Sequence, residues 1–181
     1  MYQHILLAVA LQQWEGFSPH ALAAREAAVA MAKGSGAKLS VLSVYDYDYE
    51  QPEALSLPAS EFARYRDTQI ARIDELMATK LQTFLANVQA SEIPLAPMLK
   101  VGDPRQVIVA TAEALGVDLL VIGSHSKRNF LDVLLGGTAT AVTRQAPCAV
   151  VMVHPGEQRA VPQSSEVGES LQSTTVQQPA T

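Results

Sequence analysis

The feature of this sequence that most constrains its fold is a regular alternation of short apolar runs with longer stretches of helical spacing. Residues 5–9 form a continuous apolar run, which is typical of a parallel strand buried on both faces. Further strands are predicted at 39–44, 95–101, 118–122 and 148–153, with a helical segment before each. This alternation predicts an α/β fold: a doubly wound, Rossmann-like parallel five-stranded sheet with helices on both faces.

Capping residues mark the ends of the predicted helices. Ser18 and Pro19 predict an N-cap and a first-turn proline for a helix over residues 21–33, and we expect Gly34 to end it. Asp103, which also precedes a proline, predicts the same kind of start for the third helix.

The second helix, over roughly 59–89, is the longest predicted element, and the last helix covers 138–145. The second helix carries apolar residues at helical spacing, and we expect this stripe to pack against the sheet. The stripe consists of Ile73, Leu76, Met77, Leu81, Phe84, Leu85 and Val88.

Composition limits the partners and the location of this chain. Hydrophobic residues make up 48% of 181 residues, enough for the core of one domain. The net charge is −5 and no long basic run occurs, so we expect neither a nucleic-acid nor a membrane partner. The apolar N-terminal stretch is shorter than the roughly 20 residues of a membrane span, so we expect a cytoplasmic protein. The single cysteine, Cys148, is expected to be a buried, reduced thiol.

The composition changes after His154-Pro155. Residues 156–181 are rich in Gln, Ser, Thr, Glu and Pro and contain no aromatic residue. Such a segment buries too little apolar surface to offset its ordering entropy. We therefore predict one domain over 1–155 and a disordered C-terminal tail over 156–181.

The segment with the clearest chemical meaning is residues 123–138, a loop that follows a predicted buried strand and opens a helix. Such a loop can present backbone N–H groups to phosphate oxygens, and its glycines permit left-handed backbone and close approach of a ligand. It contains no P-loop motif, and the first strand is not followed by a Rossmann glycine fingerprint. In a doubly wound sheet, ligands bind at the carboxyl ends of the strands, where the strand order reverses.

This loop resembles the nucleotide loop of universal stress proteins, whose ATP-binding members carry Gly, two residues, Gly, nine residues, Gly and then Ser or Thr. Residues 102–104, 117–123 and 147–153 are also similar to that family, and the resemblance covers about residues 3–153. It implies an adenine nucleotide alpha-hydrolase-like fold and a stress-response protein that acts as a dimeric sensor or adaptor. The implied ligand is ATP or AMP, with or without Mg²⁺, or a cyclic nucleotide, and no redox cofactor is expected.

The sequence departs from the ATP-binding pattern at three positions. Ser126 stands at the second glycine, and Gly137 stands at the hydroxyl residue, although Thr138 follows it. Ala10 stands where ATP-binding members resemble one another in an aspartate that meets the adenine or ribose region. Lost contacts and backbone strain at these positions would weaken binding by roughly one to two powers of ten without abolishing it.

The loop and the resemblance together predict a nucleotide site. Lys127 and Arg128 either neutralise a polyphosphate or form an exposed basic pair, and His125 is expected to be a hydrogen-bonding or solvent-facing imidazole. The acidic, tyrosine-rich loop over 45–50 either lines the site or is an ordinary surface loop. The predicted nucleotide-binding residues are Ala8, Ala10, Val44, Ile122, Gly123, Ser124, His125, Ser126, Lys127, Arg128, Gly136, Gly137 and Thr138.

Two other functions remain open at this level. The first alternative is a family member that has lost nucleotide binding and acts through contacts with an unidentified protein partner. The second alternative is a slow nucleotide hydrolase. No nucleophile–base pair and no metal-ligand spacing stands out, so we identify no catalytic or metal site. The resemblance further implies a homodimer through the last strand, Cys148 to Val153, since a bare apolar edge strand would invite aggregation.

Overall fold

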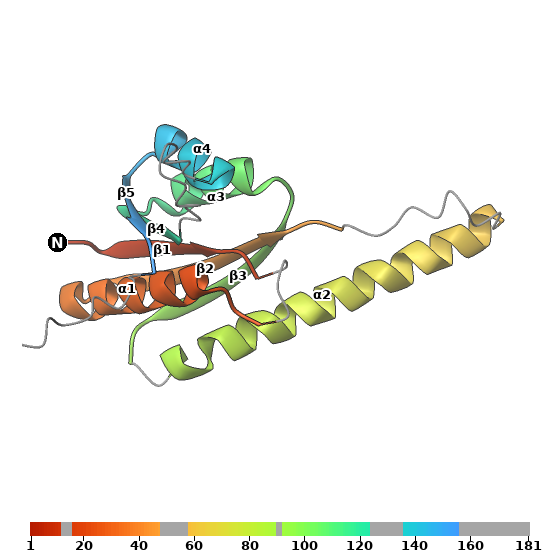
Figure 1. Ribbon diagram of the computed structural model, residues 1–181, viewed down its shortest axis with the longest axis horizontal. Helices are drawn as coiled ribbons and strands as arrows, with labels where there is room; N and C mark the ends of the chain where they lie inside the picture. Colours follow the sequence, from red (N-terminus) through yellow and green to blue (C-terminus); the bar gives the residue numbers. More distant parts are fainter. Residues whose placement is uncertain (12–15, 48–57, 90–91, 124–135, 156–181) are drawn as a thin grey trace, which may run out of the picture.

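The computed structural model describes residues 1–11, 16–47, 58–89, 92–123 and 136–155. Strands and helices alternate along these residues, as the sequence predicts (Figure 1). In chain order the elements are β1 (His4–Val9), α1 (Pro19–Ser35), β2 (Lys38–Tyr45), α2 (Ala59–Gln89), β3 (Leu95–Val101), α3 (Pro104–Leu115), β4 (Leu119–Gly123), α4 (Gly137–Gln145) and β5 (Ala149–Val153).

The five strands form one parallel sheet in the order β3-β2-β1-β4-β5, which confirms the predicted α/β fold. From β1 the chain adds β2 and β3 on one side, and it then crosses to add β4 and β5 on the other. The strand order therefore reverses between β1 and β4. The register places Leu7 of β1 beside Val41 of β2 and Val121 of β4.

Helices cover both faces of the sheet (Figure 1). α1 and α2 pack on one face, where Ile5, Leu7 and Val9 of β1 point into the core. α3 and α4 pack on the other face, against Leu6 and Ala8. Because successive strand residues point to opposite faces, a strand with cores on both sides reads as a continuous apolar run.

Helix α1 ends two residues later than we predicted. Ser18 caps its start as expected, with its hydroxyl oxygen accepting from Ala21 N–H at 3.1 Å. Gly34 does not end the helix, which continues to Ser35. Gly36 ends it instead: its φ of 72° is left-handed, and its N–H donates to the carbonyl oxygen of Ala32.

The predicted stripe of α2 faces the sheet with one exception. Met77, Leu81, Phe84, Leu85 and Val88 are buried in the core, and Ile73 packs at its edge. Leu76 is 51% exposed, so its assignment to the stripe is wrong. It is one residue from Met77, and one residue turns a side chain about 100° around a helix axis, here away from the sheet. The first turns of α2 extend beyond the sheet (Figure 1).

Three further predictions concern Cys148, membrane-spanning segments and the C-terminal tail. Cys148 lies just before β5 and is only partly buried, which corrects the expectation of full burial; burial still raises the pKa of its thiol. Within the residues described, no helix is both long and apolar enough to cross a membrane. The predicted tail, 156–181, lies outside the described residues.

Candidate functional site

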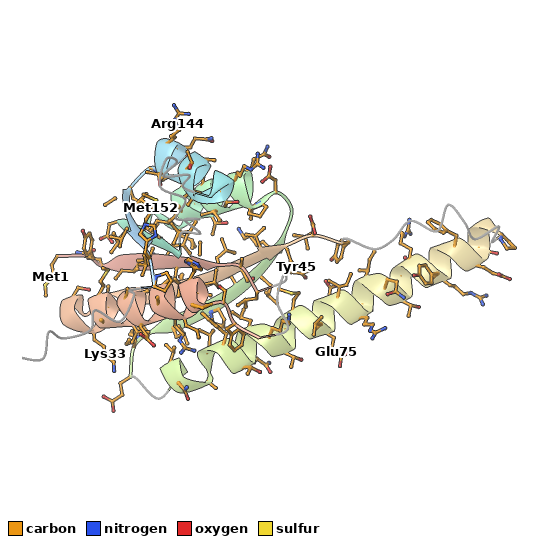
Figure 2. All side chains as sticks on the ribbon, viewed as in Figure 1. Met1, Lys33, Tyr45, Glu75, Arg144 and Met152 are labelled. Atoms are coloured by element: carbon orange, nitrogen blue, oxygen red, sulfur yellow. The ribbon has the colours of Figure 1, made fainter. Side chains whose placement is uncertain are left out.

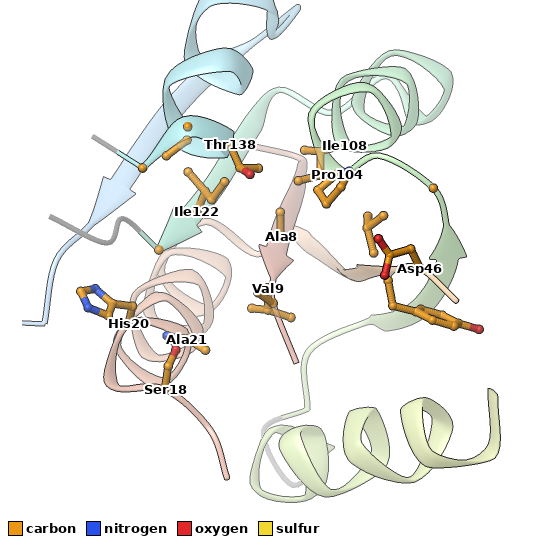
Figure 3. Close-up of a pocket in the computed structure, with 18 residues that line it drawn as sticks. Ala8, Val9, Ser18, His20, Ala21, Asp46, Pro104, Ile108, Ile122 and Thr138 are labelled. Carbon is orange, nitrogen blue, oxygen red and sulfur yellow. Dashed lines mark hydrogen bonds between the residues drawn. The ribbon is translucent and has the colours of Figure 1, made fainter. Parts of the chain in front are cut away.

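A cavity of about 580 Å³ opens at the carboxyl ends of β1, β2 and β4, where the strand order reverses (Figure 3). This is where a doubly wound sheet is expected to hold a ligand. The starts of α1, α3 and α4 also contribute to its walls. The cavity is therefore built from segments that are far apart in the sequence.

The structure brings together every predicted site residue that it describes. Those that line the cavity are Ala8, Ala10, Val44, Ile122, Gly123, Gly136, Gly137 and Thr138. The others, Ser124, His125, Ser126, Lys127 and Arg128, lie outside the described residues. That these residues bind a nucleotide stays a prediction.

One wall of the cavity is apolar. Ala8, Val44, Ile108 and Ile122 all belong to the core between the sheet and helices α3 and α4, and each is buried. Ala10 adds a methyl group at the end of β1 and no hydrogen-bonding side chain. This wall suits a flat, largely apolar group such as an aromatic base.

The N-terminus of α4 forms a second, polar part of the cavity. Gly136 is the N-cap of this helix and makes no side-chain capping hydrogen bond. Gly137 and Thr138 occupy the first turn, where backbone N–H groups have no partner within the helix and the helix dipole favours negative charge. Thr138 thus lines the cavity from the second position of the helix.

Gly123 has a packing role that the sequence did not indicate. A Cβ at this position would lie 2.8 Å from the carbonyl oxygen and 3.1 Å from the carbonyl carbon of His20. The absence of a side chain therefore lets the first turn of α1 approach the end of β4. Neither Gly123 nor Gly136 has a positive φ, so the expectation that these glycines supply left-handed backbone is wrong.

The start of the loop over 45–50 proves to be part of the sheet and the cavity. Tyr45 is a buried residue of β2, and Tyr45 and Asp46 both line the cavity. The hydroxyl groups of Tyr45 and Tyr47 donate to the same carboxylate oxygen of Asp74 on α2, at 2.7 Å and 3.0 Å. Their rings pack edge to face with centroids 5.9 Å apart. Burial is the largest cause that raises the pKa of both tyrosines, and the hydrogen bond to the Asp74 carboxylate raises it further. Both hydroxyl groups therefore stay protonated and remain donors at neutral pH.

The described lining carries little charge. Asp46 is the one Asp, Glu, Lys or Arg side chain among the lining residues that the structure describes. In the same part of the chain, no group of three or more His, Cys, Asp or Glu side chains is placed to hold a metal ion. Residues 48–50 of the predicted acidic loop lie outside the described residues.

Several lining residues were missed at the sequence level. Ser18 and Pro104 had been recognised as helix starts, and a helix start in a parallel α/β fold follows the carboxyl end of a strand, so this signal could have placed both at the cavity. Tyr45 and Asp46 belong to the loop over 45–50, for which the sequence left a place in the site open, and the structure puts both in the lining. The missed residues are Val9, Ser18, His20, Ala21, Gly102, Pro104, Ile108 and Ala139.

Comparison with known proteins decides the family. The sequence profile of the universal stress protein family matches residues 1–154. The chain belongs to this family. Universal stress protein A homolog 1 of Coxiella burnetii is 29% identical over 152 residues, which cover 84% of this chain and 96% of that protein. Universal stress protein MJ0577 of Methanocaldococcus jannaschii is 28% identical over 82 residues, 45% of this chain and only 51% of that protein.

Solved structures of universal stress proteins share the fold. The structure of MJ0577 has a TM-score of 0.61 at 23% identity and covers 87% of this chain and 99% of its own. A universal stress protein in complex with cAMP has a TM-score of 0.56 at 23% identity, with coverages of 86% and 99%. An Arabidopsis thaliana family protein with AMP bound has a TM-score of 0.55 at 18% identity, with coverages of 90% and 99%.

Proposed function

We propose that this universal stress protein binds an adenine nucleotide in the cavity at the carboxyl edge of its sheet. The observation that carries the proposal is one cavity that joins an apolar wall to the N-terminus of α4. The base packs against Ala8, Val44 and Ile122, and the phosphate lies at the first turn of α4. The complexes of two relatives with cAMP and AMP support the choice of adenine nucleotide.

The proposed role is that of a dimeric sensor or adaptor, in which nucleotide binding changes the contacts of the protein with a partner. The dimer forms through β5, an edge strand whose Val150 and Met152 are only half-buried. An apolar edge strand is a surface that a second copy can cover by strand pairing. Asp46 is the single carboxylate among the described lining residues, and the proposal therefore concerns ligand binding rather than catalysis.

The test is isothermal titration of the full chain with AMP, cAMP and ATP, the last with and without Mg²⁺. We expect saturable binding of at least one of them. Gly137→Glu places a negative charge at the first turn of α4, a site that favours acidic side chains and where a Cβ meets no atom within 4 Å. The helix should therefore form, while repulsion of the phosphate weakens binding by at least tenfold, roughly 1.4 kcal/mol.

Gly137→Gln is the matched control, because it has nearly the same size without the charge. It should bind far more tightly than Gly137→Glu. A flat trace for every nucleotide with the unmodified chain would contradict the proposal. It would favour the alternative in which the protein works through protein contacts alone, a view that the replacement of an aspartate by Ala10 already motivates.

A further inference from the structure

We infer that Asp46 selects the nucleoside end of the ligand, by accepting a hydrogen bond from a donor on the base or on the ribose. This inference rests on the proposed function and goes beyond it. Asp46 was not among the residues that the sequence predicted to bind nucleotide. It is singled out by charge, by its place in the cavity and by the contacts of its two neighbours.

The neighbours of Asp46 fix the direction of its side chain. Tyr45 and Tyr47 both hydrogen-bond Asp74 on α2, on one side of the chain. Asp46, between them in the chain, lines the cavity on the other side, as Figure 3 shows. Val44, which shares its side, packs into the core under α3 and α4 and lines the cavity. The two tyrosines and Asp74 therefore hold Asp46 toward the cavity.

The cavity has two chemically different ends. Figure 3 shows Ser18 and His20, at the start of α1, on one side of Ala8 and Asp46 on the other. Gly123, where an added Cβ would meet the backbone of His20, marks the same end as α1. Figure 3 also places Thr138, in the first turn of α4, away from Asp46, so a ligand with its anionic group at that turn extends toward a carboxylate, which accepts hydrogen bonds and repels other acceptors. A nucleotide meets both demands, with phosphate at one end and amine or hydroxyl donors at the other.

The position of Asp46 also compensates for Ala10. The register pairs Val9 of β1 with Ser43 of β2, so Ala10 falls level with Val44. Asp46 directly follows β2, two residues after Val44, and therefore lies one strand across from the alanine. A carboxylate that the family resemblance places on β1 is therefore supplied here from β2.

The experiment compares three ligands on the full chain by isothermal titration. AMP carries both kinds of donor; purine riboside 5′-monophosphate lacks the amine, and 2′,3′-dideoxy-AMP lacks the ribose hydroxyls. We expect the unmodified chain to prefer AMP at least tenfold over one analogue, about the value of a charge-assisted hydrogen bond. Asp46→Ala should lose that preference. The disfavoured analogue identifies the donor as the amine or the hydroxyls.

Glu113→Gln, which removes an exposed carboxylate of α3, is the matched control and should keep the preference. If the unmodified chain prefers AMP and Asp46→Ala keeps the same ratio, the inference is overturned while the proposed function stands. Equal binding of all three ligands by the unmodified chain also overturns it. If AMP does not bind, the inference is overturned, and the proposed function fails with it only if cAMP and ATP do not bind either.

Asp74 is expected to act as a positioning residue. Asp74→Ala releases both tyrosine hydroxyls, so it should reduce the preference for AMP over the disfavoured analogue in the direction of Asp46→Ala. Glu75→Ala, on the exposed side of the same helix turn, is the control and should leave the ratio unchanged (Figure 2). An unchanged ratio in Asp74→Ala, with the chain folded by circular dichroism, would contradict the positioning role.

Discussion

Gly123 lines the proposed site and also lets the first turn of α1 pack closely against the end of β4. A side chain here would push against the backbone of His20, which cannot rotate away as a flexible side chain would. We expect Gly123→Ala to destabilise the fold by about 1–3 kcal/mol, the usual cost of overpacking, and to shift the start of α1. Urea unfolding measures the first effect.

Gly137→Ala is the control for that prediction. Its Cβ would meet no atom within 4 Å, so its stability should stay within about 1 kcal/mol of the unmodified chain. Equal destabilisation by the two substitutions would show that the contact with His20 is not the cause.

Asp118 provides a test at acid pH. Its carboxylate accepts from the backbone N–H groups of Gln3 at 2.7 Å and His4 at 3.2 Å, and these bonds, Gln3 first, lower its pKa. A carboxylate whose pKa is lower in the folded state stabilises the fold at pH values above its unfolded-state pKa, which is near 4. This stabilisation is lost as the pH falls through the folded-state pKa.

Asp118→Asn should therefore cost about 1 kcal/mol at pH 7, given that the site is partly exposed to solvent. The difference from the unmodified chain should shrink as the pH drops below about 4. Denaturant unfolding across pH 3–7 measures both. A difference between Asp118→Asn and the unmodified chain that stays constant across this pH range would contradict the linkage.

Residue identities alone pointed to Gly123 as special, but for the wrong physical reason. The sequence suggested backbone freedom, and the structure shows a close approach of two elements. The contact of Tyr45 with Asp74, 29 residues away, could not be foreseen at all, since no local pattern links a strand end to a particular turn of the next helix. Asp46 belongs to the loop over 45–50, which the sequence left open as either site lining or ordinary surface, and only the packing of the strand end decides between the two.

At the scale of elements, the two glycines near the end of α1 give opposite predictions. Gly34 lies inside the helix, where a Cβ would meet no atom within 4 Å, so Gly34→Ala should stabilise the protein by about 0.5–1 kcal/mol. Gly36 has a φ of 72°, so Gly36→Ala should destabilise it by about 1 kcal/mol. Thermal unfolding of both variants checks the signs; a reversed order would place the helix end at Gly34.

Gly34 and Gly36 also show where sequence patterns no longer determine the bounds of a helix. Strong signals fixed α2 and β3, whose predicted bounds agree with the structure. Two glycines separated by one residue are both acceptable helix ends, because the choice depends on where the chain must turn toward β2. Leu76 fails similarly: its type fits a core stripe, while the position of the sheet decides that it is exposed.

At the scale of the whole molecule, the alternation of strands and helices was sufficient for the fold and for the edge that holds the cavity. A parallel sheet requires crossovers, and the carboxyl ends of its strands then gather on one edge. The complete lining was not predictable in this way. A lining residue such as Ile108, one turn into α3, joins the cavity only because α3 packs over the end of β2, which is a tertiary arrangement.

The proposed dimer through β5 is a property of the whole molecule, and the mass of the protein in solution tests it. If β5 pairs with its own copy, light scattering should give twice the chain mass. Val151, the central residue of β5, lies near the two-fold axis of such a pair, where two introduced lysines would repel each other. Val151→Lys should therefore yield monomer with its circular dichroism spectrum retained.

Val101→Lys tests the specificity of that effect, because Val101 is 44% exposed on β3, the opposite edge of the sheet. It should leave the mass of the unmodified chain unchanged. A monomer mass for the unmodified chain over a range of concentrations would contradict the dimer. Loss of the dimer in Val101→Lys but not in Val151→Lys would place the contact at β3, and the partner-binding surface of the proposed adaptor would then include the free edge of β5.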